Sequence, residues 1–472
     1  MNWRCLSIIV ILFFNFCIIG LSVCHGFAQN PDILSLEQVL QGFEEPSITV
    51  PVPEQSQGEN QNSSDNSESF PDLNFTGSFS THISYSPYRH TTAAGYSIHG
   101  LTSFKPYLAL FLAGKLSEDW LMKISGWSFY DFAYTLQGRD NYSPEVLDNY
   151  EQEMELGEAY LGGRLSPLLD ITVGRQIVVW GKSDFFGIAN MVNPVDNRER
   201  GMDDIEIKRL PLWMTRLDAY LGPWRVSGLL THELRYSKNP VYGHDFYPYD
   251  FPAPPREDRS NNLENSSFGI SLERVYNGVD IGFYYGSFLK ELDMVGLTSE
   301  VSQLSLNRLT LFSMAAEKAM DHWLFKMEAG VVGGLEYYSL PEQEKTRLDL
   351  LLGTDYTGFR NTRLSLEIIN RHLFKLDSEV AERDDTPSQD SLVWAFRAAR
   401  TFHREKLQFI FLSYVGGVTF SQGSVQSVSA EYEVNDSLAV TAGYVFIHSG
   451  DNYIMRDMGD NDRILLKLNY KF

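Results

Sequence analysis

The sequence contains very little cysteine. Cys5, Cys17 and Cys24 are its only three, and all lie within the first 24 residues. If those residues form a leader that is removed on export, the exported chain has no thiol, which excludes a disulfide framework, a zinc–thiolate site and a cysteine nucleophile. Beyond residue 24 the sequence also lacks any apolar run near the roughly 20 residues that a membrane-spanning helix needs. A membrane protein with this sequence must therefore be a closed β-barrel, while a soluble secreted β-protein stays open as the alternative.

Positive charge is scarce as well. The chain has 39 Lys and Arg residues against 61 Asp and Glu, a net charge of −22 at pH 7. Residues 29 to 71 carry no Lys or Arg at all. Because so acidic a chain repels phosphate backbones, we expect no nucleic-acid partner.

The first residues have the pattern of a secretory signal peptide. Arg4 precedes a mostly apolar stretch from residue 6 to residue 23, and Gly26-Phe27-Ala28 places small residues where a leader peptidase reads them. We predict a signal peptide over residues 1 to 28, cleaved after Ala28. A lipoprotein signal ending at Cys24 and an uncleaved anchor helix are the alternatives.

Residues 29 to 71 form a separate predicted tail in the periplasm. Ser35 to Phe43 has apolar residues at helical spacing behind a capping-box pattern, which predicts one short amphipathic helix. Residues 44 to 70 are polar and poor in large apolar groups, so we expect them to be disordered. The tail is either a plug or docking segment for a periplasmic carrier or exporter, or a tether without fixed structure.

The last ten residues alternate strictly between apolar and polar side chains. Because side chains of a strand alternate between its two faces, Ile464, Leu466, Leu468, Tyr470 and Phe472 share one face. A lipid-facing strand that ends in Phe resembles the closing strand and assembly signal of a Gram-negative outer-membrane β-barrel. We therefore expect outer-membrane lipids, lipopolysaccharide and the barrel assembly machinery as partners.

From residue 72 onward, strand-like runs alternate with short and long connections. Eight short turns recur, from residues 117–120 to residues 435–437, and nine longer polar segments fall between and around them. This count predicts an all-β transmembrane antiparallel barrel over residues 72 to 472, with 18 strands, short periplasmic turns and long external loops. Sixteen strands is the second choice. The aromatic content of 13% fits girdles at two membrane interfaces.

Charged residues occur on the face opposite the predicted lipid face. Such residues are tolerated at membrane depth when they meet water or a counter-charge, which the aqueous interior of a large barrel provides. By this phase Lys326 and Glu328 line the lumen. The other predicted lining residues are Lys123, Asp131, Arg216, Asp218, Arg225, Glu233, Glu273, Arg347, Arg363, Glu367, Arg397, Glu431 and Glu433. They either line an open lumen or neutralise one another inside a plugged barrel.

The segment from Val173 to Arg200 is the most specific part of the sequence. It contains Gly174-Arg175-Gln176, then Trp180-Gly181-Lys182-Ser183-Asp184, then Asn193-Pro194-Val195-Asp196 and Arg198-Glu199-Arg200. This segment resembles a family of uncharacterised, porin-like Gram-negative outer-membrane barrels known only as a domain of unknown function. The resemblance implies a large barrel and transport of apolar or lipid-like cargo beside envelope exporters.

Physically, the same segment is a strand followed by a long loop. Asn193-Pro194 forces a turn, because proline fixes its own φ and restricts the residue before it, and Asp196 can lock that turn. If residues 182 to 210 fold inward, this mixed-charge loop narrows the pore; if they fold outward, it only caps the barrel. The constriction candidates are Lys182, Asp184, Asn193, Asp196, Arg198, Glu199, Arg200, Asp203 and Asp204. Arg175 shares its strand phase with apolar neighbours, so a bulge or an internal strand is needed there.

No catalytic or metal motif is complete in the sequence. Gly181-Lys182-Ser183 lacks the first glycine of a phosphate-binding loop, and the histidines lack partners at metal-ligand spacing. We therefore predict a protein that is not an enzyme and holds no cofactor or metal. Residues 237 to 265 place aromatic side chains among prolines, which makes either a surface that captures ring-bearing cargo or a rigid lid.

Two classes of function remain. The first is a porin-like channel that passes small polar or amphipathic solutes, or lipid-like cargo, across the outer membrane. The second is a largely closed barrel that acts as a structural or docking component of an envelope export or lipid-transport system. An enzyme at the barrel rim is the third.

Overall fold

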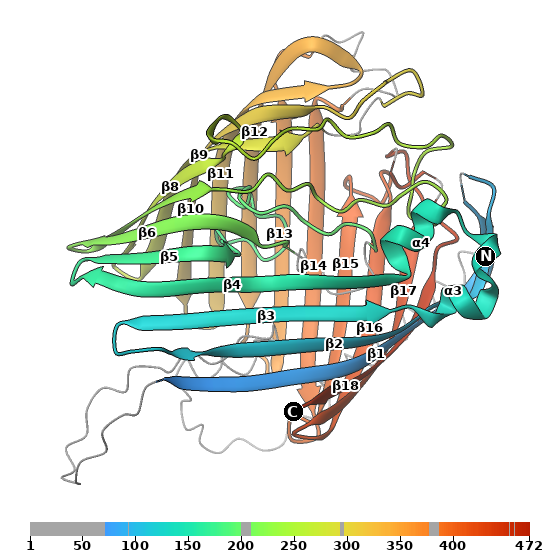
Figure 1. Ribbon diagram of the computed structural model, residues 1–472, viewed down its shortest axis with the longest axis horizontal. Coiled ribbons are helices and arrows are strands. Elements are labelled where there is room, and N and C mark those ends of the chain that lie inside the picture. Colours follow the sequence, from blue (N-terminus) through green and yellow to red (C-terminus); the bar gives the residue numbers. More distant parts are fainter. Residues whose placement is uncertain are drawn as a thin grey trace. The chain divides into compact units, whose positions relative to one another are not determined.

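The structure, a computed structural model, describes residues 71–472 except 93, 200–208, 293–296, 377–386, 453 and 457. Eighteen antiparallel strands form one sheet in which each strand pairs with its neighbours in sequence and β18 pairs with β1, so the sheet closes into a barrel (Figure 1). The predicted fold class and strand number are confirmed. The predicted leader and most of the tail, together with Arg200, Asp203 and Asp204, lie outside the described residues.

The strands are joined in simple up-and-down order. Their bounds are β1 Asp72–Thr91, β2 Ser97–Lys115, β3 Trp120–Tyr130, β4 Gln152–Ser166, β5 Leu169–Gln176, β6 Leu212–Leu221, β7 Trp224–Thr231, β8 Phe268–Tyr276, β9 Val279–Glu291, β10 Leu306–Met320, β11 Trp323–Tyr337, β12 Leu340–Tyr356, β13 Thr362–Leu373, β14 Asp390–Phe402, β15 Leu407–Gly416, β16 Ser424–Asn435, β17 Leu438–His448 and β18 Arg463–Lys471. Short helices interrupt two of the long loops: α3 Phe132–Gln137, η1 Arg139–Asn141, α4 Pro144–Tyr150 and η2 Leu263–Asn265. Within the described ranges, none of the helices has the length and apolar character needed to cross a membrane.

The eight predicted short turns all join consecutive strands at one end of the barrel. At the turn between β8 and β9, Asn277 and Gly278 both have positive φ, of 51° and 74°, as a tight two-residue hairpin requires. One predicted long loop, residues 337 to 345, is mostly strand instead, since β11 runs to Tyr337 and β12 begins at Leu340. Tyr337 and Leu340 pack with Leu373 in a buried apolar cluster, and this contact extends the hairpin.

The strands show the two faces that their sequence predicts. On β18, Ile464, Leu466 and Leu468 are exposed, while the intervening side chains are more buried. Phe312 on β10 and Leu352 on β12 are likewise among the most exposed large apolar residues, at 61% and 65%. Exposed apolar side chains on the outer face are what a barrel in lipid requires.

The barrel closes where the end of β18 meets β1. The backbone N–H of Phe472 donates to the carbonyl of Gly77 at 2.9 Å, and the N–H of Gly77 donates to the carbonyl of Phe472 at 2.8 Å. The Phe472 ring lies so close to Gly77 that a Cβ there would be 2.5 Å from the ring atom Cζ. Phe472 therefore both extends the closing ladder and covers the glycine opposite.

We expect Phe472→Ala to lower the yield of folded, heat-modifiable barrel several-fold. The change removes an exposed aromatic at the membrane interface and uncovers the seam at Gly77. Folded and unfolded forms are separated by gel mobility before and after heating. Phe472→Tyr, which keeps the ring, serves as the control, and wild-type yields from the alanine variant would contradict the prediction.

Candidate channel constriction

The loop between β5 and β6, which we call the constriction loop, folds into the barrel rather than away from it in its described part, residues 177–199 and 209–211. Its apolar side chains, among them Val178, Trp180 and Val192, pack in one buried cluster with wall residues of β6, β7, β9, β10 and β11. Phe185, Phe186 and Ile188 pack in a second cluster with wall residues of β12 to β15. Of the two arrangements left open by the sequence, the structure has the inward one.

Trp180 anchors the first part of this loop. Its indole is 4% exposed, and its centroid lies 5.5 Å from that of Tyr284 and 6.2 Å from that of Phe288. On β8, Gly269 leaves the room that the indole fills, since a Cβ there would lie 2.4 Å from the Trp180 ring. The tryptophan of the family-like segment is thus a packing anchor for the loop.

Glu328 on β11 fixes the next turn of the loop. Its side chain is 1% exposed, and its carboxylate accepts hydrogen bonds from the backbone N–H groups of Lys182, Ser183 and Ile188, the latter two at 2.8 and 2.9 Å. The turn can approach this closely because residue 181 is glycine with φ 91°, and a Cβ there would lie 2.4 Å from Glu328 Oε1. A buried carboxylate satisfied by backbone donors is a rigid attachment.

Glu367 on β13 fixes the following residues of the loop in the same way. It is also 1% exposed, and it accepts hydrogen bonds from Ser183 Oγ at 2.6 Å, from the N–H of Asp184 at 2.8 Å and from the N–H of Phe185 at 3.2 Å. We call Glu328 and Glu367 the carboxylate clamp. Together they accept six hydrogen bonds from residues 182 to 188.

Charged side chains surround the clamp. Asp184 Oδ2 lies 2.6 Å from Lys326 Nζ and 3.3 Å from Arg363, and both cations also pair with Asp355 on β12. On the neighbouring wall, Lys182 Nζ lies 2.5 Å from Asp280 of β9. The predicted candidates Asp184, Arg363 and Glu367 therefore meet in one charged network around Lys326, while Lys182 pairs separately with Asp280.

Asn193 ties the two ends of the loop together. Its side-chain oxygen accepts from the N–H of Val178 at 2.9 Å, and its amide donates to the carbonyls of Gln176 and Leu210 at 3.1 and 3.0 Å. Asn193 is buried, so these bonds replace the water that the backbone groups have lost. The Asn-Pro motif therefore closes the base of the loop.

Arg198 and Asp196 form a clasp to the neighbouring loop. The guanidinium of Arg198 lies 2.6 Å from both Asp196 and Glu153, and it donates to the carbonyl of Asn149 at 2.5 Å. Burial alone would lower the pKa of Arg198, but the bonds and charges of Asp196 and Glu153 outweigh it and raise that pKa. Arg198 is thus engaged in holding the loop, and its part in a pore constriction stays a prediction.

Other predicted residues also form ion pairs. Glu199 lies 2.8 Å from Lys105 on β2, and Lys123 lies 2.5 Å from Glu158 on β4. A second network on β6 to β8 joins four predicted or neighbouring residues: Arg216 to Asp218 at 2.9 Å, Arg225 to Asp218 at 3.6 Å, and Arg225 to Glu273 at 3.4 Å.

Two predicted lining residues have other positions. Asp131 follows β3 and caps helix α3, where its carboxylate accepts from the N–H groups of Ala133 and Phe104 and from Ser103 Oγ. Glu233 lies in the loop after β7 and accepts from the N–H of Trp213 at 3.1 Å. Both residues lie just beyond the end of a strand, where the alternating phase no longer applies. Arg397, Glu431 and Glu433 lie on β14 and β16, and Glu431 accepts from Thr441 Oγ1 at 2.9 Å.

The long loop between β7 and β8 reaches a distant part of the barrel rim. Arg463, at the start of β18 and 1% exposed, forms an ion pair with Asp245, and Asn461 donates to the carbonyl of Asp245 at 2.8 Å. Phe246 packs with Val445, Ile447 and Met458. We call residues 242 to 251 the mouth strap, because they connect the β7–β8 side of the ring to β17 and β18. The sequence indicated its aromatic character but not this attachment.

The described residues contain no group of three or more His, Cys, Asp or Glu side chains that could hold a metal ion.

Burial alone would raise the pKa of Asp245, but His244 and Arg463 outweigh it and hold that pKa well below its usual range. The strap carboxylate is therefore ionised, as its pairing with Arg463 requires.

Comparison with known proteins identifies a family and a set of similar barrels. The family described as "Protein of unknown function (DUF1302)" matches residues 102–472. No curated protein matches the sequence. Among solved structures, the outer membrane protein OpdK of Pseudomonas aeruginosa has a TM-score of 0.48 at 10% identity, over 85% of this chain and 99% of its own. A BenF-like porin of Pseudomonas fluorescens Pf-5 has a TM-score of 0.49 at 11% identity, over 85% and 98%. At such low identity these likenesses say nothing about cargo.

Proposed function

The chain belongs to the DUF1302 family of unknown function, and we propose that it passes small polar or amphipathic solutes, lipid-like cargo included, across the outer membrane. The family resemblance expected from the Val173–Arg200 segment is confirmed, and the protein is a porin-like barrel of the bacterial outer membrane. The proposal is that solutes pass through this barrel and that they belong to these classes.

The inward loop held by the carboxylate clamp is the observation that carries this proposal. A loop that only capped the barrel would not need two fully buried carboxylates on the opposite wall to fix residues 182 to 188. Ionic groups gathered at a narrow point select solutes strongly, because little water screens them there. The paired charges around Asp184 and Lys182 would form such a point in an open channel.

One observation favours the second candidate, a largely closed barrel that docks an envelope carrier or exporter. The loop fills part of the interior with two buried apolar clusters, and apolar packing of this kind can seal a lumen. In that case residues 29 to 71 would be the docking segment. In both cases we expect insertion by the barrel assembly machinery and contact with outer-membrane lipids and lipopolysaccharide, and no enzymatic activity.

Conductance separates the two candidates. Purified, folded protein added to a planar lipid bilayer should give stepwise ion currents of uniform size in potassium chloride. Heat-denatured protein is the control for contaminating porins and membrane damage. Folded protein that inserts, as shown by protection of the barrel from protease, but gives no steps would overturn the channel proposal in favour of the closed barrel.

A further inference from the structure

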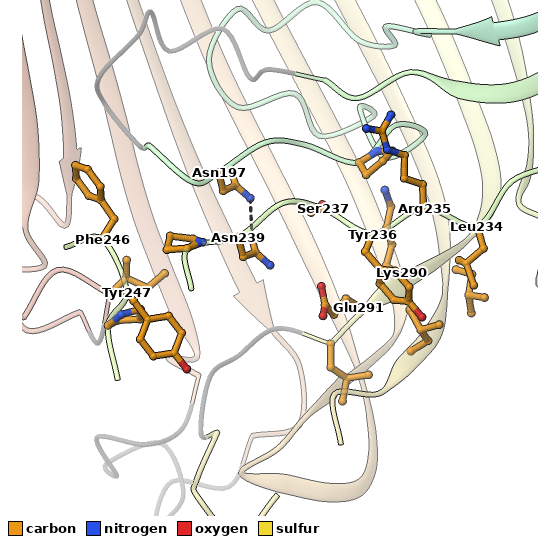
Figure 2. Close-up of a pocket in the computed structure, with 17 residues that line it drawn as sticks. Asn197, Leu234, Arg235, Tyr236, Ser237, Asn239, Phe246, Tyr247, Lys290 and Glu291 are labelled. Atoms are coloured by element: carbon orange, nitrogen blue, oxygen red, sulfur yellow. Dashed lines mark hydrogen bonds between the residues drawn. The ribbon is translucent and has the colours of Figure 1, made fainter. Parts of the chain in front are cut away.

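A cavity of about 290 Å³ lies at the long-loop end of the barrel, between the constriction loop, the β7–β8 loop and the end of β9 (Figure 2). Much of its lining is apolar or aromatic, as Figure 2 shows for Tyr236, Phe246 and Tyr247. Pro194, which follows the loop-closing Asn193, is also part of the lining. The cavity therefore adjoins the base of the constriction loop.

Most polar groups of the lining already have strong partners. Arg235 lies 2.8 Å from Glu155 and donates to the carbonyl of Pro211 at 3.0 Å. Glu291 lies 2.9 Å from Arg256. Asn197 and Asn239 are hydrogen-bonded to each other at 3.2 Å, as the dashed line in Figure 2 marks.

Lys290 is the exception. Among the described residues, the only hydrogen bond of its ammonium group is a long one, from Nζ to the carbonyl of Asn193 at 3.4 Å. Across the described ranges of the chain, no carboxylate lies within ion-pair distance of this ammonium group, whereas Lys105, Lys123, Lys182 and Lys326 each have such a partner. An ammonium group beside apolar walls and without a counter-charge is costly, and a bound anion would remove that cost.

We propose that this cavity binds a small amphipathic monoanion, with a carboxylate against Lys290 and an apolar body against the aromatic and proline walls. A single cation without a partner matches a single negative charge. The volume lies at the small end of ligand pockets, which sets the scale of the solute to a short-chain or single-ring acid. A role of this cavity in capturing solutes before they reach the constriction loop rests on the proposed channel function. Binding of the anion to the cavity does not rest on it.

The test compares an acid with its neutral isostere on the full-length, detergent-solubilised barrel. Hexanoate and hexanamide are titrated by isothermal calorimetry, with heats into empty micelles subtracted. We expect hexanoate to bind at least about tenfold more tightly than hexanamide, since loss of one charge-assisted contact corresponds to a factor of this size. Equal affinity of the two probes in the wild-type barrel would overturn the proposal without any variant.

Variants then assign the effect to Lys290. Lys290→Gln should lose the preference for hexanoate while keeping the weak binding of hexanamide, and Lys290→Arg should keep the preference. Lys318→Gln, on an exposed lysine of β10 at the short-turn end, is the matched control and should bind like the wild type. A preference for hexanoate that survives in Lys290→Gln would place the anion elsewhere and overturn the assignment.

The outcome is separable from that of the channel proposal. A barrel that binds hexanoate through Lys290 but gives no current in a bilayer has the site and not the proposed function. A barrel that conducts but does not prefer hexanoate has the function and not the site.

Discussion

Replacing Glu328 and Glu367 together by alanine is expected to raise single-channel conductance several-fold and to make the open current noisy. The two carboxylates accept six hydrogen bonds from residues 182 to 188, and each buried donor left without a partner costs about 1 kcal/mol or more. The double change also removes the Glu367 charge 4.0 Å from Lys326. The loop should therefore leave the wall and widen the passage.

Planar-bilayer recording of the purified double variant gives the measurement. Glu344→Ala, which removes an exposed carboxylate near the long-loop end of β12, is the control for a general loss of negative charge. Heat-modifiable mobility confirms that the barrel itself is folded. If the folded double variant conducts like the wild type, the loop does not limit the passage, and the lumen wall alone must do so.

The second large effect is expected at the mouth strap. Asp245→Asn should destabilise the strap attachment by about 3 kcal/mol, because it leaves the guanidinium of the buried Arg463 without its ionic partner. Chymotrypsin should then cleave the aromatic segment from Tyr242 to Phe251 at a much higher rate than in the wild type, while the barrel strands stay protected. Asp250→Asn, on an exposed residue of the same segment, is the matched control.

The same contact predicts how the strap responds to acid. The folded pKa of Asp245 lies below its usual value, so the stabilisation is present above the unfolded pKa of about 3.9 and is lost only as the pH falls through the lower folded pKa. Cleavage of the wild-type strap at pH 5 should therefore match that at pH 7 once the activity of the protease is corrected for. Release of the strap between pH 7 and pH 5 would show that another group controls it.

Strand number and turn positions could be predicted because both depend on local sequence. The alternation on β18 and the Asn277-Gly278 turn need no information from elsewhere in the chain. The failure at residues 337 to 345 has a tertiary cause, since Leu373, which packs there on Tyr337 and Leu340, comes from another strand.

The site was harder to predict for the same reason. Strand phase places Glu328 and Glu367 on the inner face, but it cannot reveal that their partners are backbone N–H groups of a distant loop. Nor could the charge of Arg198 reveal that Glu153 and Asp196 already neutralise it. The surroundings of Asp245 and Lys290 depend on which loops contact one another at the barrel mouth. The pattern of a single sequence does not indicate these contacts.

The attachment of the constriction loop also sets an order of events during assembly. Ser183 belongs to the first half of the chain, yet its partners Glu328 and Glu367 follow it by 145 and 184 residues. Contacts across such separations form late, because much chain must be ordered before they can close. The loop can thus reach its final place only after β11 and β13 have joined the sheet. We therefore expect a nascent barrel to pass through a stage in which this loop does not yet fill part of its lumen.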